Sequence, residues 1–125
     1  MRLQGKVAIV TGSSSGLGQA TAVLFAQEGA KVVVNADRNV QGGEETVRLI
    51  REAGGEAIFV QGSVARGEDC KRLVKAAIDT YGKLDVLVNN AGIEIRGGVL
   101  TLSEEAWDRM LAVDLKGIFM VAREA

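Results

Sequence analysis

Short, wholly apolar runs alternate along this chain with longer segments in which apolar residues recur every three or four positions. Apolar runs without strict alternation are typical of strands buried on both faces of a sheet, and the longer spacing is typical of helices with one buried face. The pattern predicts four strands, at residues 6–10, 32–35, 57–60 and 84–88.

Helical spacing follows the first two predicted strands. The first helix should end at Gly29, and the second should follow a polar, loop-like stretch at residues 36–43 and end at Gly54. Each helix should pack on the sheet through its apolar face. The residues expected on these faces are Leu17, Ala20, Leu24, Val47 and Ile50.

A third helix is predicted at residues 68–81, and its apolar face carries the only cysteine of the chain. The members of this face are Cys70, Leu73, Val74, Ala77, Ile78 and Tyr81. A single cysteine allows no disulfide within the chain, and the absence of histidine removes a common zinc ligand. We therefore expect Cys70 in the core, no metal site, and Tyr81 at the end of a buried face.

Two further helices are predicted in the last quarter of the sequence. Ser103 is suited to cap the first, which would bury Trp107, and residues 114–125 have the pattern of the second. Alternating strands and helices predict a parallel sheet with helices on both faces, because parallel neighbours need long return connections. The length of 125 residues fits one such domain over residues 1–125.

Charge and hydropathy narrow the classes of partner. The 15 basic and 16 acidic residues are scattered along the chain, so no basic patch indicates nucleic acid binding. The apolar runs are far shorter than the roughly 20 residues that a membrane helix needs. We therefore expect neither nucleic acid nor membrane as a partner, and a cytoplasmic protein.

A glycine-rich turn at residues 11–18 joins the first predicted strand to the first predicted helix. Gly12, Gly16 and Gly18 suit a loop that adopts unusual dihedral angles and lets a ligand approach the backbone. Unpaired amides at the helix start would attract phosphate. In this context of strand, turn and helix, the spacing indicates a nucleotide site rather than a tight connection without a ligand.

Two other interpretations of this turn compete with the nucleotide site. Gly12, Ser14 and Gly16 also fit the nucleophile elbow of hydrolases, but a serine nucleophile needs a positioned base, and the chain has no histidine. That interpretation would hold only if another chain supplied the base. A phosphate-binding loop of the ATPase type is excluded because Gln19, not lysine, follows the last glycine and the spacing differs.

Two motifs together resemble those of the short-chain dehydrogenase/reductase family. They are Thr11-Gly12-x-x-x-Gly16-x-Gly18 and Asn89-Asn90-Ala91-Gly92. The resemblance extends over essentially the whole chain. It implies an α/β fold, a three-layer, Rossmann-like doubly wound parallel sheet with strand order 3-2-1-4, truncated before the later strands. It also implies an NAD(P)-dependent oxidoreductase that transfers hydride between a cofactor and a carbonyl or alcohol.

The resemblance assigns cofactor contacts to four places in the chain. The turn would cradle the pyrophosphate, the end of the second strand and the end of the third would hold the adenosine, and the segment after the fourth strand would line the riboses. The implied cofactor-binding residues are Gly12, Ser14, Gly16, Leu17, Gly18, Asp37, Arg38, Ser63, Val64, Asn90, Ala91 and Gly92.

The end of the second strand should select between NAD and NADP. An acid there would bind the ribose 2′-hydroxyl, whereas a basic residue would admit a 2′-phosphate. Ala36 stands where the family usually has its NAD-selecting acid, and Asp37 and Arg38 follow. If Asp37 points into the site, NAD is favoured, and if Arg38 does so, NADP is favoured. Both stay open, and our expectation is NAD.

Two positions depart from the family pattern. Ser63 stands where the family often has an aspartate near the adenine. Asp114 stands where an asparagine commonly helps to organise the catalytic site, and an ionised aspartate can accept hydrogen bonds but not donate them. The departure at Asp114 leaves the role of that residue open, and the departure at Ser63 weakens the expected contact with the adenine.

The family's catalytic serine and Tyr-x-x-x-Lys pair fall beyond this sequence, and Asp85 rather than lysine follows Tyr81 by four positions. We therefore expect no catalytic residues here and a cofactor-binding half that is inactive alone. A non-catalytic nucleotide-binding or scaffold module is the alternative. An apolar edge strand at residues 84–88 and the helix at residues 114–125 would favour a homo-oligomer or association with another chain.

Overall fold

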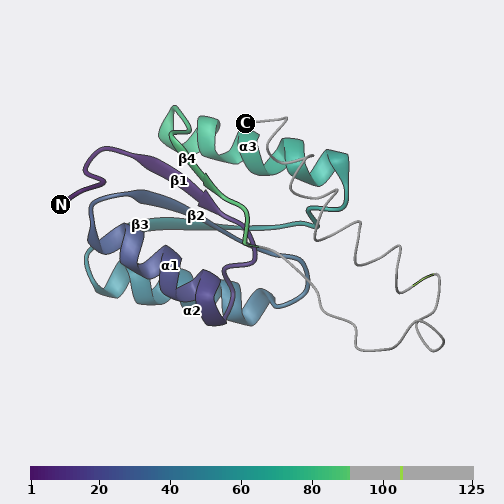
Figure 1. The fold of residues 1–125 in the computed structure, drawn as a ribbon, viewed down its shortest axis with the longest axis horizontal. Coiled ribbons are helices and arrows are strands. Elements are labelled where there is room, and N and C mark those ends of the chain that lie inside the picture. The colour runs from purple at the N-terminus through teal and green to yellow at the C-terminus, as the bar shows by residue number, and fades with distance from the viewer. Residues whose placement is uncertain (91–104, 106–125) are drawn as a thin grey trace.

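The computed structural model describes residues 1–90 and residue 105, and the described strands form one parallel sheet. The strands are β1 (Val7–Val10), β2 (Lys31–Ala36), β3 (Glu56–Gln61) and β4 (Val86–Val88). The helices between them are α1 (Gly16–Gln27), α2 (Val40–Glu52) and α3 (Gly67–Tyr81). The strand order is β3-β2-β1-β4, as predicted (Figure 1).

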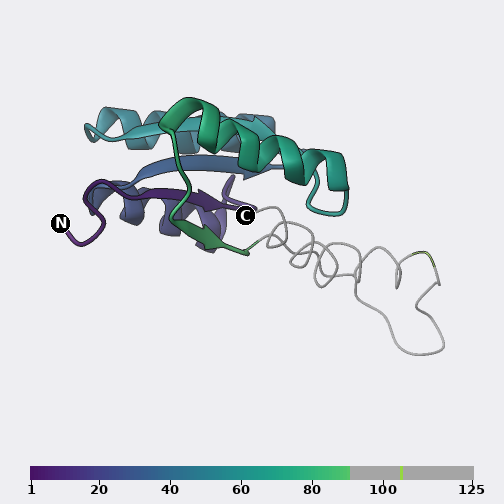
Figure 2. The ribbon, with the colours of Figure 1, turned by 90° about the horizontal axis from the view of Figure 1, so that it is seen from above.

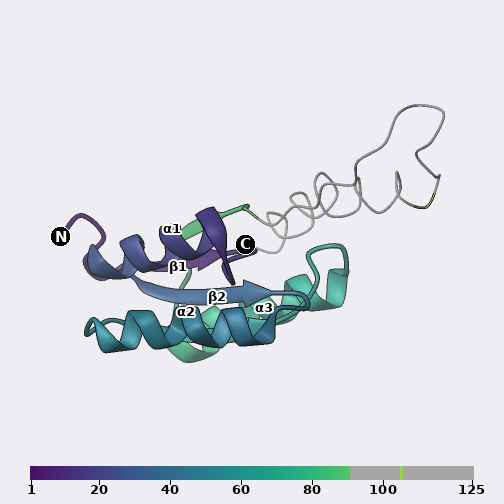
Figure 3. The same ribbon diagram turned by 90° about the horizontal axis from the view of Figure 1, so that it is seen from below.

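The helices cover both faces of the sheet and so make three layers. Figure 2, seen from above, shows α3 on one face, and Figure 3, seen from below, shows α1 and α2 side by side on the other. The prediction of a three-layer, doubly wound, Rossmann-like fold is therefore confirmed. The predicted helices after residue 92 lie outside the described residues.

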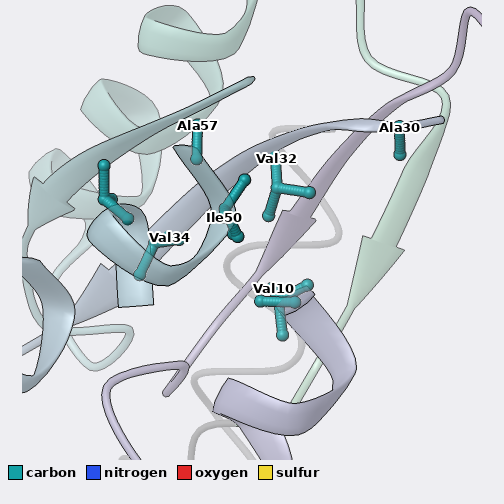
Figure 4. Close-up of a cluster of buried hydrophobic side chains, with 8 residues drawn as sticks. Val10, Ala30, Val32, Val34, Ile50 and Ala57 are labelled. Atoms are coloured by element: carbon teal, nitrogen blue, oxygen red, sulfur yellow. The ribbon is translucent and has the colours of Figure 1, made fainter. Parts of the chain in front are cut away.

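The valine-rich strands are buried on both faces, which explains why they lack polar alternation. Val7, Ile9 and Val33 point toward α3, where Cys70 is 1% exposed in the same cluster. On the other face, β1 and β2 supply a second cluster that packs against α1 and α2, and its labelled members include Val10 and Val34 (Figure 4). The prediction that Cys70 is a core residue is confirmed.

The predicted apolar face of α1 is wrong. Leu17 and Leu24 are 76% and 53% exposed, and Ala20 is exposed as well. The helix instead buries Gly18 and Ala22 against the sheet. Val23, Phe25 and Ala26 also pack against the cluster on this side, so the inward face combines small residues near the turn with larger apolar residues further along the helix.

On α3 the predicted face is nearly right. Cys70, Leu73 and Ala77 are buried, and Tyr81 packs at the edge of their cluster. Ile78 is the exception, because it is 45% exposed. It lies at the margin of the apolar stripe, where periodicity alone does not separate a buried residue from an exposed one.

Two elements begin at least two residues away from the predicted position. Helix α2 begins at Val40, inside the stretch expected to be a loop, because the Asn39 side chain accepts a hydrogen bond from Gly42 N at 2.9 Å and caps it. Strand β4 begins at Val86 rather than at residue 84. The Asp85 carboxylate accepts the Val7 N–H at 2.9 Å, so a side chain replaces the backbone partner that would extend the strand.

None of the helices in the described part of the chain is both long and apolar enough to cross a membrane.

Candidate functional site

The glycine turn, residues 11–18, lies at the carboxyl edge of the sheet, immediately after β1. From β1 the chain proceeds through β2 to β3 on one side, and β4 then pairs with β1 on the other side. The direction in which successive strands are added to the sheet therefore reverses beside β1. In open parallel sheets, ligands bind at such a switch point, outside the carboxyl ends of the strands.

The turn needs glycine at three positions, for two physical reasons. Gly12 and Gly16 have φ angles of 62° and 55°, which residues with a side chain rarely adopt. Gly18 is helical, but a Cβ there would overlap the carbonyl oxygen of Gly12 and lie 2.5 Å from Asn90 Nδ2. Gly18 therefore allows α1 to start directly against the turn.

Ser13 fixes the first half of the turn to the end of β2. Its backbone N–H donates to Asn35 O at 2.8 Å, and its hydroxyl donates to Val10 O at 2.7 Å. The Asn35 N–H in turn donates to the Ser13 hydroxyl at 3.0 Å. Ser13 is fully buried. These bonds satisfy the polar groups of the turn internally and fix its path.

Helix α2 provides a second attachment for the turn. The buried Thr46 hydroxyl lies 2.8 Å from Ser13 O and 2.9 Å from Gly42 O, and it receives a hydrogen bond from Gln19 Nε2 at 3.0 Å. A Cβ on Gly42 would lie 2.5 Å from Ser14 O. The start of α2 therefore packs directly on the turn.

The end of β4 provides the third attachment. Asn90 Nδ2 donates to Gly12 O at 3.1 Å, and the Asn90 N–H donates to the Thr11 hydroxyl at 3.0 Å. Thr11 N donates to Val88 O at 3.1 Å. Asn90 thus joins two of the motifs noted in the sequence, the turn and the segment that follows β4.

The second half of the turn is more open than the first. Ser15, Gly16 and Leu17 are exposed, and Ser14 is half-buried. Ser15 is the N-cap residue of α1, and within residues 1–90 its side chain makes no capping hydrogen bond. The first amides of a helix lack intrahelical partners, so the start of α1 has donors that a bound anion can use.

Asp37 and Arg38 lie between β2 and α2, at the same edge of the sheet. Both are exposed. The Asp37 carbonyl accepts a hydrogen bond from Gln61 Nε2 at 3.0 Å, which ties the loop to the end of β3. Both side chains are therefore at the rim of the site, and their backbone is held while their charged ends face solvent.

Ser63 and Val64 follow β3 and are 8% and 7% exposed. Ser63 N donates to Asp69 Oδ2 at 2.9 Å, and Val64 belongs to the cluster under α3. The crevice that these residues line with Asn35 is too small to hold a water molecule. The predicted residues Ala91, Gly92 and Asp114 lie outside the described residues.

Tyr81 lies at the opposite edge of the sheet. Its ring is 5.6 Å from Lys31 Nζ, at the amino end of β2. Burial, followed by the negative charge of Glu56, raises the pKa of the Tyr81 hydroxyl, so it stays protonated at neutral pH. This position agrees with the prediction that Tyr81 ends a buried face.

Sequence reasoning missed Ser13, Asn35 and Thr46, which hold the turn from inside. The signal available for two of them was a polar residue next to an apolar run, as in Ser13 after β1 and Asn35 within β2. Thr46 gave no such signal, because threonine is ordinary in a helix. Among the described residues, no cluster of three or more potential metal ligands is present.

Comparison with known proteins gives one consistent result. The sequence profile described as short chain dehydrogenase matches residues 6–125. An uncharacterized oxidoreductase of Thermotoga maritima is 47% identical over 125 residues, which are 100% of this chain and 49% of that protein. The 3beta-hydroxysteroid dehydrogenase 1 of Eggerthella lenta is 46% identical over 98% of this chain and 47% of its own length.

Solved structures agree with the sequence comparisons. A short-chain dehydrogenase/reductase from Serratia marcescens has a TM-score of 0.96 and 36% identity, and the match covers 100% of this chain and 51% of that one. A short chain dehydrogenase from Mycobacterium avium has a TM-score of 0.94 and 40% identity, with 100% and 46% coverage. The chain thus spans about half the length of the relatives it matches.

Proposed function

The chain belongs to the short-chain dehydrogenase family, and we propose that it holds the dinucleotide cofactor of an NAD(P)-dependent oxidoreductase. The parent reaction would move a hydride between the nicotinamide and a carbonyl or alcohol. The observation that carries this proposal is the glycine turn at the switch point of the sheet, followed directly by the start of α1.

The predicted site residues divide by their place around the turn. We propose that Ser14, Gly16 and Leu17 bind the pyrophosphate, with Gly12 and Gly18 allowing its close approach. Exposure of the first group and the tight packing of Gly18 support this division. Asn90, Ala91 and Gly92 would line the riboses, and Ser63 with Val64 would lie beneath the adenosine.

We propose that NAD is preferred over NADP through Asp37. A carboxylate at the rim repels a 2′-phosphate and can accept hydrogen bonds from a ribose 2′-hydroxyl. The neighbouring Arg38 is equally exposed and would have the opposite effect. Asp37→Asn and Arg38→Gln are therefore a matched pair. The first should narrow the preference for NADH over NADPH, and the second should widen it, in titrations of both nucleotides.

Catalysis would need residues that this sequence does not contain. The only tyrosine is Tyr81, Asp85 rather than lysine follows it by four positions, and it lies at the edge of the sheet opposite the turn. We therefore propose that the purified 125-residue chain binds nucleotide but does not transfer hydride. Turnover of any alcohol or carbonyl above background would contradict this.

The lone cysteine is consistent with a cytoplasmic location.

Calorimetric titration with NADH and NADPH tests the cofactor assignment. The chain should bind at least one of them, and Gly16→Asp should abolish binding, because its side chain would strain the backbone at a φ of 55° and put a negative charge in the open space beside the turn. Leu24→Asp is a control that adds the same charge to an exposed position later in α1. Equal affinity of Gly16→Asp and the unmodified chain would remove the assignment.

A second candidate is an interaction module that pairs with another chain. Strands β3 and β4 are the outer ones among the described strands, and the three residues of β4 are only half-buried. Leu17 and Leu24 are exposed apolar side chains on α1. Unpaired strand edges and apolar surface favour association. Sedimentation analysis would separate the candidates, since a monomer that binds NADH would argue against this one.

A further inference from the structure

We propose that Asn35 is a positioning residue for the nucleotide site, which acts by holding the Gly12 amide in place. This inference rests on the proposed cofactor binding at the glycine turn. Asn35 stands near the carboxyl end of β2, it is 2% exposed, and its side chain reaches both the turn and the neighbouring strand. A buried polar side chain that is hydrogen-bonded on all sides fixes the relative positions of the groups that it contacts.

The side-chain amide of Asn35 uses its donors and its acceptor in opposite directions. Nδ2 donates to Val60 O at 3.1 Å and to Gly62 O at 3.2 Å, both at the end of β3. Oδ1 accepts the Gly12 N–H at 3.3 Å, in the turn after β1. The side chain therefore connects the carboxyl ends of β1, β2 and β3 in one hydrogen-bonded bridge.

The backbone of Asn35 strengthens the same connection. Its N–H donates to the Ser13 hydroxyl at 3.0 Å, and its carbonyl accepts the Ser13 N–H at 2.8 Å. Two consecutive residues of the turn, Gly12 and Ser13, are thus both attached to Asn35. The position of the turn relative to β2 is set by this one residue.

A displacement of Gly12 would reach the ligand-binding part of the turn. The Gly12 carbonyl lies in close contact with Gly18, so the start of α1 rests on Gly12. If Gly12 moves, the first amides of α1 move with it. Asn35 therefore determines where those amides point. It does so without touching the nucleotide, because its own N–H and C=O groups are hydrogen-bonded to Ser13.

No other residue type provides this set of bonds. An ionised aspartate of the same shape has acceptors only, so it would face the carbonyl oxygens of Val60 and Gly62 without a proton to donate. Leucine would fill the space but leave two carbonyls and one N–H unpaired. The exchange of one amide NH₂ for an oxygen is therefore the most specific test.

The experiment compares Asn35→Asp with two controls in the 125-residue chain. Val7→Ala removes buried methyl groups at the opposite edge of the sheet and so lowers stability without touching the turn. Gln27→Glu makes the same amide-to-carboxylate change at an exposed position near the end of α1. Affinity for NADH is measured by calorimetry at a temperature where circular dichroism shows each variant fully folded.

For Asn35→Asp we expect a rise of about tenfold or more in the Kd for NADH, since the hydrogen bonds to Val60 O and Gly62 O are lost and even one lost buried hydrogen bond is worth about that change. In Asn35→Ala, which removes the acceptor of the Gly12 N–H, the Gly12 amide should also exchange its hydrogen faster, as seen by NMR. Val7→Ala should lower the melting temperature and leave the Kd unchanged, and Gln27→Glu should change neither. If Asn35→Asp does not fold, Asn35→Ala carries the same comparison without the charge.

The outcomes separate this inference from the proposed function. If the unmodified chain binds neither NADH nor NADPH, both proposals are overturned. If the unmodified chain binds NADH and Asn35→Asp binds it equally well while melting at a lower temperature, Asn35 has a structural role only. An unchanged exchange rate at the Gly12 amide in folded Asn35→Ala would likewise overturn the positioning role.

Discussion

The substitution Gly18→Ala tests the closeness of the glycine turn to α1. Gly18 has an ordinary helical backbone, so alanine would introduce no strain in its dihedral angles. The added methyl group would overlap Gly12 O and lie 2.5 Å from Asn90 Nδ2. A backbone oxygen cannot rotate away as a flexible side chain can, so the helix or the turn must shift.

The expected magnitude is the difference between two effects. Overpacking a tight site costs about 1–3 kcal/mol. Replacing glycine by alanine inside a helix gains about 1 kcal/mol from helix propensity. Because the overlap involves backbone, the upper part of the first range applies, and we expect a net loss of about 2 kcal/mol. The start of α1 should also move, and nucleotide affinity should fall with it.

Urea unfolding followed by circular dichroism measures this loss, and Gly54→Ala is the matched control. Gly54 has a φ of 89°, and the space that an alanine methyl group would occupy there is open, so alanine brings strain without overlap. That strain should cost about 1–2 kcal/mol and leave NADH affinity unchanged, since Gly54 follows α2. A Gly18→Ala variant at least as stable as the parent would refute the close packing of α1 on Gly12.

Four other substitutions give separate checks. Asn39→Ala should cost about 1 kcal/mol in urea unfolding because it removes the cap of α2, whereas Ser15→Ala should be nearly neutral because that side chain makes no capping bond among the described residues. Thr46→Val should cost about 1–2 kcal/mol in the same assay, since it removes the one hydroxyl proton that Ser13 O and Gly42 O share and the acceptor of Gln19 Nε2. The Val7 N–H and then Lys83 hold the pKa of Asp85 below its ordinary 3.8. The stability from Asp85 is therefore present above that value and lost as pH falls through the lowered one, and Asp85→Asn should flatten this acid limb of melting temperature against pH.

The sheet could be predicted from the sequence because its signal is local. Each valine-rich run is long enough to specify a strand buried on both faces, and helical spacing between runs requires parallel strands. The burial of Cys70 followed from its place among apolar residues on α3. The turn could be located from its glycines alone. Gly12 and Gly16 have the positive φ angles that such a turn was expected to need.

The face of α1 could not be predicted, because its pattern offers two solutions. Leu17 and Leu24 are exposed, whereas Gly18 and Ala22 are buried and Phe25 packs on the core cluster. The close contact of Gly18 with Gly12 O fixes which side of the helix faces inward at its start. A tertiary contact of this kind is absent from the local periodicity.

The two halves of the turn differ in how their polar groups are used, and this difference explains why anchors and ligand contacts occupy different residues. Thr11 and Ser13 are buried, and their backbone amides donate to carbonyls of β4 and β2. Gly16 and Leu17 are exposed at the start of a helix whose first amides lack intrahelical partners. A site whose scaffold is already hydrogen-bonded needs little ordering when its ligand arrives, and lower ordering cost favours affinity. Substitutions in the first half should therefore act on affinity through the shape of the turn, and those in the second half through direct contact.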